Sequence, residues 1–242
     1  MTGSATPISS LAHDGRGSLS GLAAELAPHG LILRGGFSPA PEENLGATLI
    51  LVGNAGPAMW EAFAPHIDGA PDPLNRWTRE VVEPIAARFG GRALYPFGEP
   101  SWPFQRWAIR AETLFSSPLG LLIHPEYGLW HAWRAALVFA GRLPLPSGRE
   151  AQSPCDSCAA KPCLNACPVG AFTGQTYDVP VCAVHLGSAA GTCVEAGCHA
   201  RNACPVGAEW RYPQPQIRFH MAAFARSVAA ASRPEPPGRW SV

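Results

Sequence analysis

The stretch from Pro154 to Ala171 reads PCDSCAAKPCLNACPVGA, and the stretch from Gly197 to Ala208 reads GCHARNACPVGA. Both end in the segment NACPVGA, so the region carries an internal repeat in which each copy has a proline directly after a cysteine. All eight cysteines of the 242-residue chain lie between Cys155 and Cys204. These repeated cysteine motifs decide how the C-terminal part of the chain is interpreted.

The spacing of the first four cysteines suits a metal–sulfur cluster. Their order, Cys155-x2-Cys158-x4-Cys163-x3-Cys167-Pro168, is close to the C-x2-C-x2-C-x3-C-P run of bacterial ferredoxins, with two extra residues before the third cysteine. Gaps this short let one loop turn three sulfur atoms toward three corners of one cube, while the fourth cysteine ligates the other cluster. The repeat therefore predicts a ferredoxin-like segment with two 4Fe-4S clusters.

In this interpretation the two halves of the repeat exchange one ligand each. The first cluster is expected on Cys155, Cys158, Cys163 and Cys204, and the second on Cys167, Cys182, Cys193 and Cys198. The long gap between Cys182 and Cys193 leaves two alternatives for the second cluster. Either one of these two cysteines is a bystander and His185 or His199 completes the ligand set, or the site holds a 3Fe-4S cluster.

Composition limits the classes of protein and partner. Eighteen basic and eighteen acidic residues give a formal charge of zero, so no nucleic-acid partner is expected. The N-terminal sequence MTGSATPISS lacks the features of a signal peptide, and no stretch of eighteen apolar residues predicts a membrane span. We therefore expect a cytoplasmic protein whose cysteines bind metal and are not paired in disulfides.

The distribution of elements predicts an α+β protein with three segments. Residues 1–148 are expected to form an N-terminal α/β-type domain, 149–212 the two-cluster segment, and 213–242 a C-terminal helix and tail. A helix is predicted over 72–89, with Asp72 as its N-cap and Gly90 after its end. Residues 130–140 are apolar enough to form either a buried strand or a buried helix, and residues 143–154 read as a linker.

The cysteine arrangement resembles that of the epoxyqueuosine reductase family and of the related corrinoid-dependent reductive dehalogenases. In that family the ferredoxin-type run is followed by an isolated cysteine, here like Cys182, by a Gly-Cys pair, here Gly197-Cys198, and by Cys204-Pro205. Upstream, LLIHPEYGLW over residues 121–130 looks like the family's apolar strand and N/H-P-x-x-G-x-W turn. The similarity covers residues 111–207.

The resemblance implies a reductase. Where this sequence departs from the family's motifs, the roles of the family's residues are not assigned to this chain. The family's proton-donating aspartate heads an Asp-Tyr-His element, and the comparable residues here are Asp72-Pro73-Leu74, which makes Asp72 a candidate for catalysis. His124 is a second candidate for catalysis. The family's Gly-Trp-x-Gly-Lys loop near its corrinoid is replaced by Ser116–Gly120, and the helical-repeat extension that helps to grip tRNA is absent from this sequence. A corrinoid is expected from the resemblance alone, and tRNA modification is not expected of this chain.

Two functions of different classes follow. In the first, the clusters deliver single electrons from a reduced ferredoxin- or flavodoxin-type donor to a small-molecule substrate or cofactor held by the N-terminal domain. In the second, the chain is a stand-alone electron carrier without substrate chemistry. A scaffold stabilised by zinc is a minor third interpretation, because zinc requires neither the x3 spacing nor the proline after the fourth cysteine. The aromatic residues expected to line a pocket or fill the core are Trp102, Phe104, Trp107, Tyr127, Trp130 and Trp133, with His124 and His131 nearby.

Overall fold

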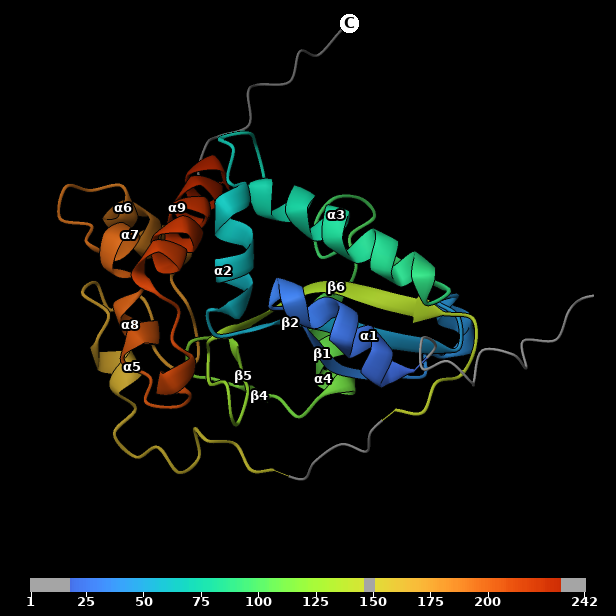
Figure 1. Cartoon of the computed structure of the whole chain (residues 1–242). Helices are drawn as coiled ribbons and strands as arrows, with labels where there is room; N and C mark the ends of the chain where they lie inside the picture. Colours follow the sequence, from blue (N-terminus) through green and yellow to red (C-terminus); the bar gives the residue numbers. More distant parts are fainter. Residues whose placement is uncertain (1–17, 146–150, 232–242) are drawn as a thin grey trace, which may run out of the picture. The chain divides into compact units, whose positions relative to one another are not determined.

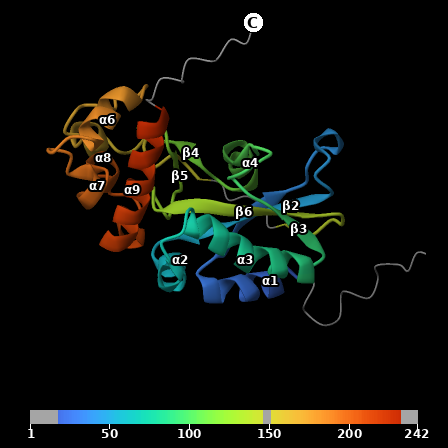
Figure 2. The ribbon, with the colours of Figure 1, turned by 90° about the horizontal axis from the view of Figure 1, so that it is seen from above.

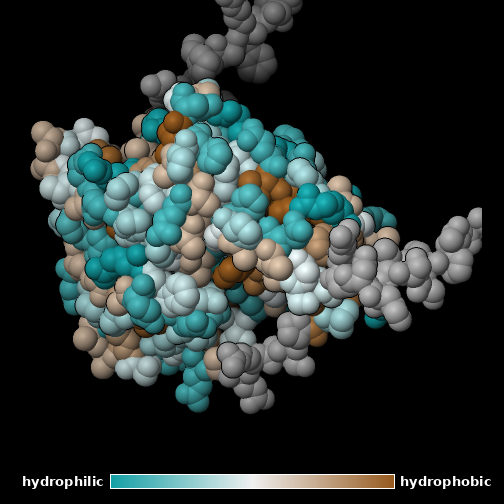
Figure 3. Space-filling view, in the orientation of Figure 1, coloured by the Kyte–Doolittle hydropathy of each residue, from teal (hydrophilic) through white to brown (hydrophobic). Residues whose placement is uncertain are grey.

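The computed structural model describes residues 18–145 and 151–231 (Figure 1). The N-terminal segment without signal-peptide features, part of the expected linker and the expected C-terminal tail lie outside the described residues. Within the described ranges, no helix combines the length and hydropathy needed to cross a bilayer. On the face seen in Figure 3, hydrophilic residues cover most of the described surface and hydrophobic patches are small.

The chain divides into two units that alternate along the sequence. Unit 1 contains Met1–Thr113 and His131–Glu150, and unit 2 contains Leu114–Trp130 and Ala151–Val242. Residues 114–130, which the sequence analysis grouped with the N-terminal domain, thus pack with the cysteine segment, and so does the C-terminal helix. The mixture of helices with an antiparallel sheet confirms the expected α+β class.

Unit 1 is built on a four-stranded antiparallel sheet. Its strands, in spatial order, are β1 (Ile32–Phe37), β2 (Thr48–Ala55), β6 (His131–Phe139) and β3 (Gly91–Leu94). Its helices are α1 (Leu19–Leu26), α2 (Ala58–Phe63), α3 (Pro73–Arg88) and α4 (Phe104–Ala111). Helices α1 and α3 lie on one face of the sheet and α4 lies on the other (Figure 2).

The central strands explain why the apolar segments fold as they do. Every residue of β2 is buried, as expected for a strand covered on both faces. The ambiguous segment 130–140 forms strand β6 because it pairs with β2 on one side and β3 on the other, from Ala55↔His131 to Thr48↔Phe139. Tertiary pairing therefore decided between two conformations that hydrophobicity alone left open.

Helix α3 follows the expected boundaries closely. Pro73 occupies its first turn, Leu74, Trp77 and Ile85 are buried on one face, and Gly90, with φ of 71°, lies just beyond its end. Asp72 stands at the N-cap position, but in a left-handed conformation with φ of 49°, and its side chain makes no capping hydrogen bond. The helix therefore begins through its proline and its buried face, without help from the expected aspartate cap.

Unit 2 consists mainly of short elements connected by loops. These are β4 (Phe115–Ser116), β5 (Leu122–Ile123), α5 (Pro162–Asn165), α6 (Val179–Leu186), α7 (Cys193–Ala196), α8 (His199–Asn202) and α9 (Gln214–Ala231). Its core joins Leu119, Ile123 and Leu129 of the first segment to Cys163 and Cys204 of the second. Helix α9 packs on α6 and α7 through a separate cluster, which contains Val228 together with Leu186 and Cys193.

Candidate functional site

Four cysteines line a small cavity in unit 2. They are Cys155, Cys158, Cys163 and Cys204. The first two lie in the loop before α5, the third is on α5 itself, and Cys204 follows α8. Helices α5 and α8 pack on each other, and this packing brings the later half of the repeat to the loop of the earlier half. The cavity has a volume of about 20 Å³.

A lysine and a pair of glycines shape this first quartet. The Nζ of Lys161, the only lysine of the chain, donates hydrogen bonds to the carbonyl oxygens of Cys155, at 3.2 Å, and Cys158, at 3.3 Å. Behind Cys204, Gly207 lies against the backbone of Tyr127 and Gly128, and a Cβ on either glycine would overlap the other loop. The His-Pro-x-x-Gly turn is therefore a direct support of the Cys-Pro loop.

The other four cysteines line a second and much larger cavity in the same unit. They are Cys167, Cys182, Cys193 and Cys198. Cys182 is on α6, Cys193 begins α7 and Cys198 is the N-cap residue of α8. The cavity volume is about 420 Å³. The backbone N–H of Ala171 donates to the Sγ of Cys167 at 3.4 Å, a contact of the kind that stabilises a thiolate.

The histidines considered as alternative ligands line this second cavity as well. The Nε2 of His185 lies 3.5 Å from the Sγ of Cys193, and the Nε2 of His199 lies 3.0 Å from the Oγ1 of Thr192. All four cysteines of the second set and both histidines thus border the same cavity. In the described part of the chain, no group of three or more His, Cys, Asp or Glu side chains is arranged to hold a single metal ion.

Burial and neighbouring thiols raise the pKa of cysteines in each quartet. Burial raises the pKa of Cys155, and the nearby thiols of Cys204 and Cys163 raise it further. Burial likewise raises the pKa of Cys193, with Cys182 and Cys167 adding to the effect. The thiols that influence each other therefore belong to the same quartet. Without metal the thiols of Cys155 and Cys193 stay protonated at neutral pH, so their binding to a cluster must release protons.

The two candidates for catalysis, Asp72 and His124, belong to different units. Asp72 is exposed at the start of α3 in unit 1. His124, in unit 2, accepts hydrogen bonds on Nδ1 from the backbone N–H groups of Glu126 and Tyr127, both at 3.1 Å, and its ring stacks on Tyr127 with centroids 4.3 Å apart. Because Nδ1 accepts two bonds, the neutral ring carries its proton on Nε2.

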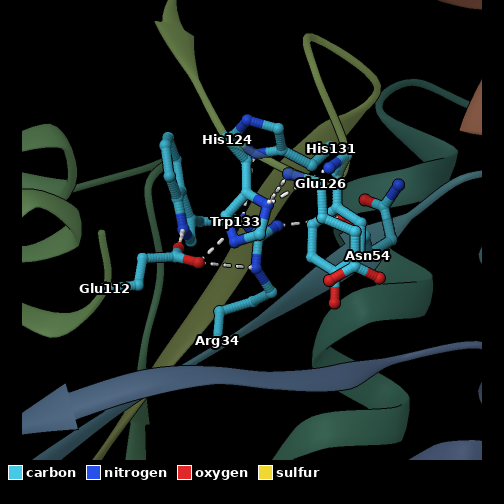
Figure 4. A network of polar contacts seen from close by, with 8 residues as sticks. Arg34, Asn54, Glu112, His124, Glu126, His131 and Trp133 are labelled. Atoms are coloured by element: carbon cyan, nitrogen blue, oxygen red, sulfur yellow. Dashed lines mark hydrogen bonds and ion pairs between the residues drawn. The ribbon is translucent and has the colours of Figure 1, made fainter. Parts of the chain in front are cut away.

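A buried polar network in unit 1 was not predicted from the sequence (Figure 4). Arg34 Nη2 pairs with Glu112 Oε2 at 2.9 Å and lies 3.2 Å from His131 Nδ1, while the indole N–H of Trp133 donates to Glu112 Oε1 at 2.7 Å. The Arg34 Nη1 donates to the carbonyl oxygen of Asn54 at 3.1 Å. The Arg34 side chain is 1% exposed, and burial raises the pKa of Glu112 although Arg34 opposes the shift. The one sequence signal for this network is an arginine inside the apolar run LILRGGF.

The aromatic residues divide between core positions and this network. Phe104 and Trp107 are buried in unit 1, with ring centroids 5.2 Å apart, and Trp102 lies 5.6 Å from Trp107. Trp130 is buried in unit 2 against Tyr212. Three of the aromatics expected to line a pocket or fill the core are therefore core residues.

The fold that these features define combines a helix-flanked antiparallel sheet with a segment in which two interleaved cysteine quartets line separate cavities. Comparison with solved structures gives this fold a known counterpart. Epoxyqueuosine reductase from Streptococcus thermophilus superposes with a TM-score of 0.50 at 16% identity, over 81% of this chain and 66% of that one. The Bacillus subtilis enzyme matches with a TM-score of 0.45 at 16% identity, over 73% of this chain and 54% of that one.

This likeness confirms the expected resemblance at the level of the fold. The chain spans 66% of the length of the Streptococcus enzyme. No protein-family model and no curated protein matches the sequence.

Proposed function

We propose that this chain is an iron–sulfur protein whose two 4Fe-4S clusters transfer single electrons, and that it acts as a reductase related to epoxyqueuosine reductase. The observation that carries the proposal is that two separate cavities are each lined by four cysteines. Each quartet takes its Cys-Pro cysteine from the other half of the repeat, as two-cluster ferredoxins do.

The residues around the quartets fit such clusters. Thiolates are the usual ligands of 4Fe-4S clusters, which when bound supply one-electron oxidation and reduction. The ammonium group of Lys161 lies beside the first quartet, where its charge partly balances the negative charge of four thiolates. The Ala171 N–H donates to the sulfur of Cys167 in the second quartet, and hydrogen bonds of this kind tune cluster potentials.

The role of unit 1 in this proposal is to hold the molecule that is reduced. A reduced donor of the ferredoxin or flavodoxin type would supply the electrons, and a small-molecule substrate or a corrinoid would receive them. Support comes from the superposition on the Streptococcus enzyme, which extends over 81% of this chain. A stand-alone electron carrier is the second candidate, because unit 2 contains all eight cysteines and both cavities by itself.

The test begins with protein purified without oxygen and reconstituted with iron and sulfide. We expect a brown protein with about eight irons per chain, as two cubanes require. Cys163→Ala and Cys182→Ala should each lose about four irons, and the EPR signal that survives should differ between the two variants. A colourless protein that holds zinc, or iron content unaffected by both substitutions, would contradict the proposal.

A second measurement separates the reductase from the carrier. Adding cob(II)alamin to the reconstituted protein and recording its absorbance and EPR spectra tests whether a corrinoid binds. A spectral change would support the reductase with a corrinoid. An unchanged spectrum would leave the electron carrier or a reductase that acts directly on its substrate.

A further inference from the structure

The two cysteine cavities differ in size far more than two identical clusters require. The cavity of the first quartet measures about 20 Å³ and that of the second about 420 Å³. If each quartet holds the same cubane, as the proposed function on which this inference rests requires, the space needed at both sites is equal. The second cavity therefore has a large surplus, and its total volume falls within the range of small-molecule sites.

The surplus space is bordered by residues that do not bind the cluster. Met221 and Phe224 of α9 contribute one apolar wall, and Leu119 and Leu121, from the connection between β4 and β5, contribute another. Leu119 is 3% exposed whereas Leu121 is 46% exposed, so Leu121 lies at the solvent-facing edge. A mostly apolar cavity of this kind selects a ligand with a hydrophobic body.

Polar groups border the same cavity at a few points. The lining includes the imidazoles of His185, His199 and His220 and the hydroxyl of Tyr177, which can hydrogen-bond to a ligand oxygen. Among the described residues that line the cavity none is acidic, and Arg201 is the one permanently charged side chain. Its guanidinium donates to the carbonyl oxygen of Leu129 at 2.5 Å and lies 4.4 Å from the ring of Trp130.

The charges favour a neutral ligand. A cluster held by four thiolates is negatively charged and repels anions at short range. Arg201 is engaged with unit 2 itself, and no carboxylate in the lining is present to attract a cation. A neutral, mostly apolar molecule that accepts hydrogen bonds satisfies all of these conditions.

We propose that the second cavity binds a small, neutral, flat ring compound of the quinone class, beside the second quartet. Its ring lies between the apolar side chains of α9 and those of the β4–β5 connection, and a ring oxygen faces the imidazoles. The inference concerns binding, and the site belongs entirely to unit 2.

The probe is duroquinone, a benzoquinone whose four ring positions carry methyl groups and therefore do not add to thiols. Oxygen-free calorimetric titration into the oxidised, reconstituted protein should show saturable binding with one site per chain. Met221→Trp places a larger side chain in the cavity and should weaken binding at least tenfold. The matched control is Ala223→Trp, because Ala223 is on the same helix but exposed; its affinity should equal that of the unmodified protein.

Iron content and the EPR spectrum of the reduced clusters are measured on every variant. If Met221→Trp loses iron, Leu121→Trp at the edge of the cavity replaces it, again with at least tenfold weaker binding expected. Absence of binding to protein with about eight irons, or equal binding by the cavity variant and the Ala223→Trp control, overturns the inference and leaves the proposed function intact. Failure of the unmodified protein to assemble clusters overturns the proposed function, and this inference with it.

Discussion

Replacing Gly207 by alanine tests whether the turn at residues 124–128 supports the first cysteine quartet. The repeat provides a matched control, because Gly170 occupies the equivalent position in the other copy of NACPVGA. Both glycines have positive φ, 67° for Gly207 and 61° for Gly170. A Cβ on Gly207 would overlap the backbone of Tyr127 and Gly128, whereas a Cβ on Gly170 would meet nothing within 4 Å. The two substitutions therefore share the backbone strain and differ only in the overlap.

The magnitudes follow from these two terms. An alanine in the left-handed region costs about 1–2 kcal/mol, and this cost applies to both variants. Overpacking against backbone that cannot rotate away adds about 1–3 kcal/mol for Gly207→Ala alone. With a urea dependence of about 1–3 kcal/mol per molar, the midpoint of Gly207→Ala should lie roughly 1 M below that of Gly170→Ala.

The assay is the loss of cluster absorbance in urea without oxygen, together with iron content. Gly170→Ala should retain about eight irons per chain. Gly207→Ala should fall toward about four, because Gly207 follows Cys204 of the first quartet and the second quartet is untouched. Equal iron content and equal urea midpoints in the two variants would refute the view that the 124–128 turn supports the cluster loop.

Three further predictions concern the buried network, the thiols and the lysine. Glu112→Ala leaves the Arg34 guanidinium buried without its carboxylate and should lower the free energy of unfolding by about 3–5 kcal/mol. Its control, Glu43→Ala, breaks a pair with Arg110 at the surface and should lower the free energy of unfolding by about 1 kcal/mol or less. Equal denaturant midpoints in the two variants would contradict this prediction. Burial raises the pKa of five cysteine thiols, which are those of Cys155, Cys163, Cys193, Cys198 and Cys204. Uptake of iron and sulfide by these thiols therefore releases protons, and the yield of reconstitution, followed by absorbance, should improve from pH 7 to pH 8.5. A yield that falls over this range would count against thiol ligation. Lys161→Met removes both hydrogen bonds to the Cys155–Cys158 loop, so a chelator should remove iron from the first cluster faster than in the unmodified protein. The EPR signal of the second cluster should decay at its original rate. Equally faster loss of both clusters would show that the lysine acts on the whole unit.

Several features could be predicted from residues that lie close together in the sequence. The short gaps and the NACPVGA repeat predicted two cysteine sets, and the structure brings these same sets to two cavities. Helix α3 could be predicted because its proline, its apolar spacing and the glycine after its end all lie within one short stretch. These features depend on residues that are neighbours in the sequence, so tertiary contacts stabilise the local structure without changing it.

Other features came from contacts between residues far apart in the sequence. Arg34 and Glu112 are 78 positions apart, and neither belongs to a motif, so their ion pair could not be predicted from the sequence. The conformation of 130–140 depended on which strands were available to pair with it. The two cavities differ in their linings as well as in size: α9 borders only the second, whereas the β4–β5 connection borders both, through Pro118 at the first and Leu119 and Leu121 at the second. The sequence alone determined the grouping of the first set of sulfur atoms, since short gaps restrict where a loop can turn. The tertiary structure decided that Cys182 and Cys193 both border the second cavity, and what surrounds each set, since packing brings distant elements together.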